Sequence, residues 1–375
     1  MYSRQEEIIC KILDLKYKIY NHHPRLAAAL GRDTAQYNLH FFCHNKYMAK
    51  NIRTAMFRVD NHFYHFASVL TKIDMIKLRE LSPECHYWFT DCYDPMTVVP
   101  KVASGIQVAS IGDYNTAKSE AGATLFAKGP RICKSPKDLV RDVDAAFICN
   151  CDGDSSDHLK LAGPLIRKGI PTFIDKPFAL KTKDALAMVK LAKRYRTPIY
   201  SSSLLSVASA VDNMRKQVKQ ISGMETGVVN GAPGWATPSG QEGVIHGVSL
   251  LQAVFGYDIK WVSSSGDYPA HYTAVGYESG MQVSMFLNQG MMCYTAEIFG
   301  RNRDPNPNTL YTGAINNMDF SVGASIIAHR FKRMVKTGKP PRDYDEMISN
   351  VAVCEAAARS WKLGRKVKIN EVWKQ

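Results

Sequence analysis

Strand and helix patterns alternate from residue 106 to residue 203, and this alternation limits the possible folds more than any other feature. Ala145–Cys149 is apolar throughout, which is typical of a strand buried on both faces of a parallel sheet. The alternation predicts an α/β fold with a Rossmann-like, doubly wound parallel sheet. Its strands are expected at 106–111, 132–133, 145–149, 171–174 and 198–203, with helices at 117–126, 158–168 and from 182 onward.

A sheet of this kind needs a first strand and a first helix before residue 106. We favour 52–59 as the strand and 62–72 as the helix, which makes about 73–104 an insertion. Residues 85–90 are the alternative first strand. Residues 1–50 then form an N-terminal extension of unknown role, with a helical pattern over 6–20.

The pattern changes after residue 204. We expect an α+β domain over 205–375 with a mostly antiparallel, open sheet, following a Rossmann-like domain over 51–204. Turn residues such as Glu278-Ser279-Gly280 separate its strands. The expected strands are 260–264, 271–277, 281–288 and 292–300, and the expected helices are 207–218, 243–255, 326–336 and 344–362. Residues 223–230 connect the first two of these helices.

Composition narrows the classes of partner. The formal charge is +14, but the basic residues concentrate in segments that read as amphipathic helices, so we expect a solvated face or attraction of anionic ligands and no nucleic-acid partner. The longest apolar runs are far shorter than the roughly 20 residues that span a bilayer. Nine cysteines, with no pair at CxxC spacing, favour reduced thiols and a cytoplasmic location.

Several motifs occur in a specific order and spacing. The first group comprises Val143–Cys149, then His158 in the next helix, then Gly169–Pro177, which ends in Asp-Lys-Pro. The second is Gly240–Gly256, which resembles a helix carrying Asp-x-x-x-His, with Glu242 in place of the aspartate. The third comprises Phe331, Gly338-Lys-Pro and Glu355-Ala-Ala-Ala. Together these motifs resemble the Gfo/Idh/MocA family, the glucose–fructose oxidoreductase and inositol dehydrogenase superfamily.

The resemblance implies a dehydrogenase that uses NAD, or NADP, on a hydroxyl or keto group of a sugar, glycoside or polyol. Lys176 follows a parallel strand, where an amine can point into the ligand crevice and polarise the reacting hydroxyl. His246 can accept the hydroxyl proton. Glu242 lies one helical turn earlier, where it can orient His246 or hold a second hydroxyl.

The expected cofactor contacts lie at the ends of the predicted strands. Asp113 is placed to accept hydrogen bonds from the adenosine ribose, which favours NAD over NADP, although it is also a typical turn-starting residue. The resemblance adds Asn150, His158, Asp175 and Lys176, while His158 is equally consistent with a structural histidine.

No Gly-rich loop precedes Ile106, which departs from the family pattern. The favoured first turn contains Asn61 and His62, so either these side chains replace the glycines or cofactor binding is weakened or lost. The missing loop leaves a non-catalytic ligand-binding relative as one alternative. The resemblance leaves a second, a glycosidase that recycles its nicotinamide, since some relatives cleave glycosides in this way. His62 and His65 have HxxH spacing, but without a third ligand we expect no metal. Relatives pair the open face of the second sheet, so we expect a homodimer or homotetramer.

Overall fold

The computed structural model describes residues 51–90, 102–150, 155–220, 223–231, 241–266, 270–288, 293–301, 309–315 and 317–373. The predicted extension, residues 1–50, lies outside them. The first sheet is parallel, with the strand order β3-β2-β1-β4-β5-β6. Its strands are β1 (Ile52–Phe57), β2 (Ile106–Gly112), β3 (Arg131–Cys133), β4 (Ala145–Ile148), β5 (Thr172–Ile174) and β6 (Ile199–Tyr200).

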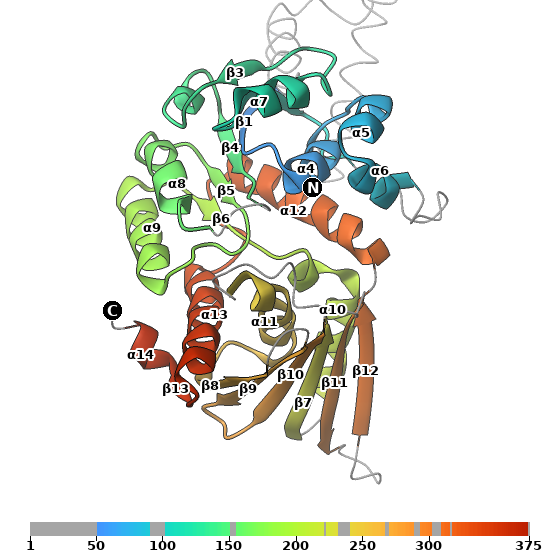
Figure 1. Cartoon of the computed structure of the whole chain (residues 1–375), viewed down its shortest axis with the longest axis vertical. Helices are drawn as coiled ribbons and strands as arrows, with labels where there is room; N and C mark the ends of the chain where they lie inside the picture. The colour runs from blue at the N-terminus through green and yellow to red at the C-terminus, as the bar shows by residue number, and fades with distance from the viewer. Residues whose placement is uncertain are drawn as a thin grey trace, which may run out of the picture. The chain divides into compact units, whose positions relative to one another are not determined.

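Helices cover both faces of this sheet, as Figure 1 shows. Successive strand residues point to opposite faces, so Met56 and Phe147 lie in one core and Phe57 and Ile148 in the other. The first core includes α4 (Asn61–Leu70) and α12 (Asn317–Thr337), and the second includes α8 (His158–Arg167), α9 (Thr182–Tyr195) and α13 (Tyr344–Leu363). The predicted doubly wound parallel sheet is therefore confirmed.

The second sheet has the order β12-β11-β7-β10-β9-β8-β13. Neighbouring strands are antiparallel except β7 and β10, which are parallel. Helices α10 (Ser209–Gln220), α11 (Gln241–Phe255) and α13 share its buried core. The strands are β7 (Gly223–Gly231), β8 (Ile259–Ser265), β9 (Ala270–Tyr277), β10 (Gln282–Asn288), β11 (Tyr294–Arg301), β12 (Thr309–Ile315) and β13 (Val367–Lys368).

Three parts of the chain differ from the expectation. The alternative first strand, residues 85–90, is wrong, because this segment lies in helix α6 (Pro83–Thr90), which follows α5 (Met75–Leu81) inside the predicted insertion. Strands β7, β12 and β13 were not expected. Helix α12 begins at Asn317, about two and a half turns before the predicted start. It contacts α4, a helix of the first half of the chain (Figure 1).

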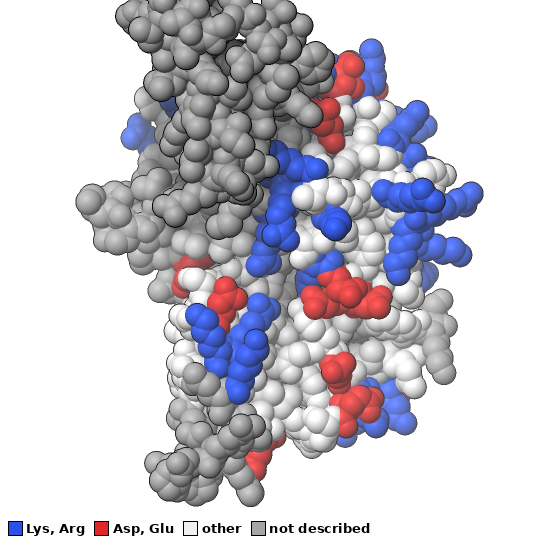
Figure 2. Space-filling model, turned by 180° about the vertical axis from the view of Figure 1, so that it is seen from behind, with Lys and Arg blue, Asp and Glu red and all other residues white. Residues whose placement is uncertain are grey.

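The basic residues do not form one continuous patch on the face seen in Figure 2. On the face seen in Figure 2, Lys and Arg side chains form separate groups, with Asp and Glu side chains between several of them. Among the described residues, no helix has the length and apolarity needed to cross a membrane. No disulfide joins the described cysteines, which are Cys85, Cys133, Cys149, Cys293 and Cys354.

Candidate active site

Polar side chains gather at the carboxyl edge of the first sheet. Strand order reverses between β1 and β4, and open α/β sheets bind ligands in the crevice beyond such a point. Arg58 follows β1, Asn150 lies just beyond β4, and Asp175 and Lys176 follow β5. The fold therefore places residues from three neighbouring strands at the edge where a ligand is expected.

Asp175 connects these residues. Its side chain is 1% exposed, and one oxygen, Oδ2, contacts Nδ1 of His62 and accepts a hydrogen bond from the Asn150 N–H at 3.1 Å. The other, Oδ1, accepts the Lys176 N–H at 2.8 Å. Burial raises the pKa of Asp175, but His62, the Lys176 charge and the Asn150 N–H outweigh it and hold the pKa below its ordinary value. Asp175 is therefore a buried carboxylate that holds the backbone just after β4 and just after β5.

His158 contacts the crevice through the side chain of Asn150. It is fully buried, with Nε2 3.0 Å from Nδ2 of Asn150 and Nδ1 3.1 Å from the Phe178 carbonyl oxygen. Both ring nitrogens thus have protein partners, as expected of a structural histidine, and His158 acts on the site by orienting Asn150. The buried Oδ1 of Asn150 has no hydrogen-bond partner among the described residues.

His246 approaches from the second half of the chain. It lies on α11, which packs closely on β10 because Gly247 leaves room for Met285. Nδ1 of His246 is 3.1 Å from Oγ of Ser203, a contact that the sequence did not suggest. Burial, followed by the positive charges of Lys176 and His62, lowers the pKa of His246 well below 6.5. Lys176, His62 and Asp175 therefore lie near enough to His246 to influence its charge.

The turn between β1 and α4 has no glycine-rich loop, and its side chains bind one another and neighbouring elements instead. Asp60 caps α4 by accepting the Phe63 N–H at 3.1 Å, so a carboxylate occupies the helix N-terminus. The amide nitrogen of Asn61 donates to Oε2 of Glu84 at 3.2 Å, which engages this side chain with α6. Arg58 has a φ of 70°, pairs with Asp157 and stacks over Tyr114 at 4.7 Å. Sequence analysis missed Arg58, although a basic residue directly after the first strand was the available signal.

Two further expected site residues remain to be placed. Asp113 is 7% exposed, and its oxygens accept the N–H groups of Val59 and Asn115, each at 2.8 Å. It thus joins the turns after β1 and β2, which is the structural role that the sequence left open. Glu242 lies in the first turn of α11, but its side chain falls outside the described residues. Within the described part of the chain, no cluster of three His, Cys, Asp or Glu side chains could hold a metal ion.

The crevice residues suit an anionic, hydroxyl-bearing ligand whose charge would interact with side chains. Arg58 and Lys176 supply positive charge, and Oδ1 of Asn150, Nε of Arg58 and Oγ of Ser155 are buried polar atoms that lack a partner among the described residues. The N–H groups of Val59 and Phe63, however, are already bound by carboxylates. A phosphate at this turn would therefore depend on the Arg58 side chain instead of on backbone N–H groups.

Buried histidines near the crevice predict acid sensitivity. Burial, assisted by the His62 charge, lowers the pKa of His65 from 6.5 to about 3. Because the folded state resists protonation, stability is complete above pH 6.5 and falls as the pH drops through that value. We expect His65 alone to cost about 1.4 kcal/mol at about pH 5.5. Urea titrations of the parent and of His65→Leu at about pH 7.5 and 5.5 would measure it.

The matched control is His329→Leu, because His329 is exposed on α12. It should lose as much stability on acidification as the parent, whereas His65→Leu should lose less. Equal acid losses in all three proteins would contradict the prediction.

Known proteins match a part of the chain in sequence. Residues 95–202 match a family model described as an oxidoreductase family with an NAD-binding Rossmann fold. Inositol 2-dehydrogenase from Paracoccus denitrificans is 34% identical over 94 residues, which cover 24% of this chain and 27% of that protein. The sequence match therefore spans about a quarter of the length of that relative.

Solved structures match over most of the chain. A scyllo-inositol dehydrogenase from Lactobacillus casei, with bound NAD(H) and scyllo-inositol, has a TM-score of 0.66 and 13% identity and covers 86% of this chain and 100% of its own. A putative myo-inositol dehydrogenase from Sinorhizobium meliloti has a TM-score of 0.64 and 16% identity, covering 85% of this chain and 100% of its own. At such identities the match establishes the fold alone.

Proposed function

We propose that the chain is a member of the Gfo/Idh/MocA oxidoreductase family and an NAD(P)-dependent dehydrogenase acting on a hydroxyl or keto group of a sugar or polyol. The observation that carries the proposal is the convergence of Lys176 and His246 at the carboxyl edge of the first sheet. These two residues come from opposite halves of the chain, and they are the pair whose chemistry this reaction needs. The inositol dehydrogenases among its relatives support a polyol as the substrate.

Each residue has a distinct task in this proposal. The Lys176 ammonium donates a hydrogen bond to the reacting hydroxyl oxygen and stabilises the charge that develops there. His246 is neutral near pH 7, because its pKa is lowered. With Nδ1–H donating to Ser203, Nε2 keeps the lone pair that accepts the hydroxyl proton. When bound, the nicotinamide supplies the hydride acceptor.

The residues proposed to hold the dinucleotide are Arg58, Asn150, Asp113 and Lys176. Arg58 would meet phosphate charge, and Asn150 offers its unpaired Oδ1 at the end of β4. Asp113 would accept a ribose hydroxyl through the lone pairs that Val59 and Asn115 leave, which favours NAD over NADP. Asp175 and His158 position these groups, while Asn61 and His62 are committed to protein partners in the described structure.

Cofactor binding is the first test of the proposal. NADH fluorescence titration should give saturable binding to the parent, and Arg58→Gln should weaken it by about tenfold or more, because a charge-assisted contact is lost. Arg79→Gln removes the same charge from an exposed position on α5 and should bind like the parent. NADH that fails to bind the parent, or binds Arg58→Gln equally well, would reject the assigned site.

One observation favours a second candidate, a non-catalytic ligand-binding protein. The Asp60 carboxylate occupies the α4 N-terminus, where a pyrophosphate would otherwise interact with backbone N–H groups. Nucleotide binding without turnover of any polyol would favour this candidate. Turnover of glycosides without net NADH formation would instead indicate the nicotinamide-recycling glycosidase. A cytoplasmic location stays a prediction.

We further propose a homodimer or homotetramer formed through the open face of the second sheet. Phe286 and Tyr272 are paired across β10 and β9 and are 39% and 42% exposed, since α10, α11 and α13 pack on the other face. Light scattering at micromolar concentration should give a dimeric or tetrameric mass for the parent and a smaller mass for Phe286→Glu. Tyr195→Glu, at an equally exposed aromatic on α9, should leave the mass unchanged. A monomeric parent would refute the proposal.

A further inference from the structure

A pocket distinct from the crevice is lined in part by residues 202–207, the segment that carries Ser203. It has a volume of about 500 Å³, and neither Lys176, His246 nor Asp175 lines it. Five parts of the chain form its wall: the segment after β6, helix α10, the end of α11, helix α12 and the entry to α13. The lining residues are Ser202, Ser206, Val207, Arg215, Gln252, Ala253, Val254, Gly256, Tyr257, Arg330, Pro341, Arg342, Asp343 and Glu346.

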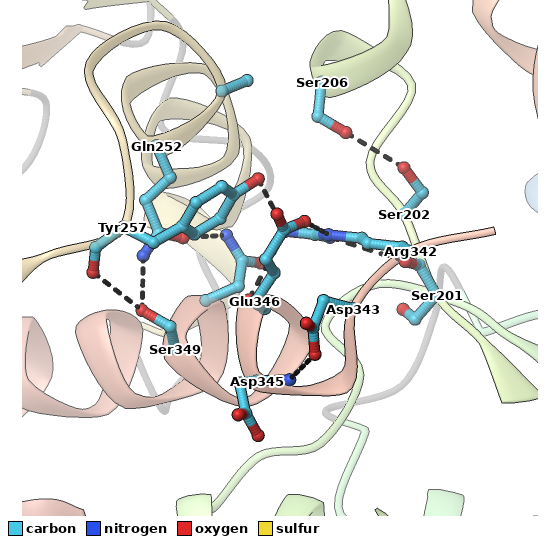
Figure 3. Close-up of polar contacts among 12 residues, drawn as sticks. Ser201, Ser202, Ser206, Gln252, Tyr257, Arg342, Asp343, Asp345, Glu346 and Ser349 are labelled. Atoms are coloured by element: carbon cyan, nitrogen blue, oxygen red, sulfur yellow. Dashed lines mark hydrogen bonds and ion pairs between the residues drawn. The ribbon is translucent and has the colours of Figure 1, made fainter. Parts of the chain in front are cut away.

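One arginine of this pocket is structural. Figure 3 shows Arg342 reaching Glu346 and Tyr257, with Nε 3.1 Å from Glu346 Oε2 and Nη2 3.2 Å from the Tyr257 hydroxyl. Its Nη1 also donates to the Ser201 carbonyl oxygen at 3.5 Å. Asp343 is likewise committed, because it caps α13 through the Asp345 N–H at 3.0 Å. Both carboxylates of the pocket are therefore occupied by protein partners.

The other two arginines have donors to spare. Arg330 is partly buried on α12, and within the described part of the chain its guanidinium has no hydrogen bond or ion pair. Arg215 donates from Nε to the Ala253 carbonyl oxygen at 2.7 Å and lies 3.5 Å from the largely exposed Asp212. A guanidinium has five N–H donors, so most of those on Arg330 and several on Arg215 face no acceptor. Positive charge without matching acceptors in a pocket favours an anion.

Hydroxyl groups on the opposite wall extend the site. Ser202 and Ser206 lie 3.0 Å apart, oxygen to oxygen, and Figure 3 shows them together on the segment after β6. Both hydroxyls donate to the Ser203 carbonyl oxygen, at 3.2 and 2.8 Å, so their remaining lone pairs can accept hydrogen bonds from a ligand that itself carries hydroxyls. We propose that this pocket binds a small hydroxylated anion, such as a sugar bearing a phosphate or carboxylate group.

The same segment links the pocket to the crevice. Ser202 and Ser206 face the pocket, while Ser203, between them, contacts His246 at 3.1 Å. A ligand held by Ser202 and Ser206 would therefore affect the position of Ser203, the residue that contacts His246. This coupling rests on the proposed function, whereas binding to the pocket does not depend on it.

Calorimetric titration of the chain without dinucleotide tests the binding. At constant ionic strength, glucose 6-phosphate and gluconate separate the two anionic groups, and uncharged glucose is the control. We expect saturable binding of at least one anion and none of glucose. Arg330→Ala should weaken that binding by about tenfold or more, with partial recovery in Arg330→Lys. No saturable binding of either anion would overturn the site.

Arg333→Ala is the matched variant, because it removes the same charge from an exposed position of α12 that does not line the pocket. It should bind like the parent, and an equal loss in both alanine variants would overturn the site in favour of general charge attraction. Saturating ligand should also change polyol turnover, and binding without such a change would overturn the coupling. Anion binding with no polyol turnover at all would instead count against the proposed function.

Discussion

Lys176→Met is expected to lower turnover by about 10²–10⁴-fold, because it removes the cation that stabilises charge on the reacting oxygen. Methionine keeps an apolar stem of similar length, so packing at the end of β5 should be preserved. Steady-state kinetics on the polyol found by screening would measure the loss. Lys183→Met, at an exposed position in the first turn of α9, should turn over at the parent rate.

His246→Asn should show a loss of similar size, but with a pH signature. The lowered pKa of His246 places its protonation below pH 6.5, so parent turnover should be flat at neutral pH and fall only in acid. The variant should lack that acidic limb and bind NADH with nearly unchanged affinity. A parent-like rate and pH profile in His246→Asn would remove the histidine from the mechanism, and a silent Lys176→Met would do the same for the lysine.

The sequence predicts the first sheet well, because its strands are signalled by local composition. Ala145–Cys149 is apolar at every position, and the observed β4 is buried on both faces. The lysine after β5 follows from the same reasoning, since the carboxyl edge is fixed once the strand is known. The convergence of His246 with Lys176 was available only through the family resemblance, because the two residues lie in separate halves of the chain.

Glycine explains why the sequence did not reveal β12 and why it placed the start of α12 too late. Gly313 interrupts the β pattern of β12, but in the fold the missing side chain makes room for Met214 of α10. Gly323 similarly weakens the helical pattern of α12, where a Cβ would lie 2.7 Å from the Leu204 carbonyl oxygen. Both glycines serve tertiary contacts, which local propensity does not contain.

The strand predicted as an alternative at 85–90 is wrong because local propensity favours a strand where the fold has a helix. Tyr87, Trp88 and Phe89 favour a strand by propensity, yet the segment is helical. Pro83 suits the first position of a helix, where its missing N–H is not needed. The position of Arg58 was equally hidden, because a glycine-free turn after β1 reads as a lost binding loop until the Asp157 and Tyr114 contacts are known.

Phe331→Ala should destabilise the protein by about 3–5 kcal/mol, the usual cost of removing a fully buried phenylalanine. Phe331 belongs to α12 but packs into the core of the first sheet, with its ring centroid 5.3 Å from that of Phe147. Phe147 in turn stacks on Phe173 at 4.1 Å, so the cavity would open beside the two central strands that carry the crevice. Urea denaturation would measure the loss.

Leu363→Ala is the control for this prediction, because Leu363 ends α13 and is 49% exposed. Its expected cost is within about 0.5 kcal/mol, as for most surface substitutions. A large loss in Phe331→Ala alone would establish that α12 stabilises the core of the first sheet, so that this sheet depends on a helix that follows it by more than 100 residues in the sequence. A loss no greater than that of Leu363→Ala would show instead that the first sheet holds its core without α12.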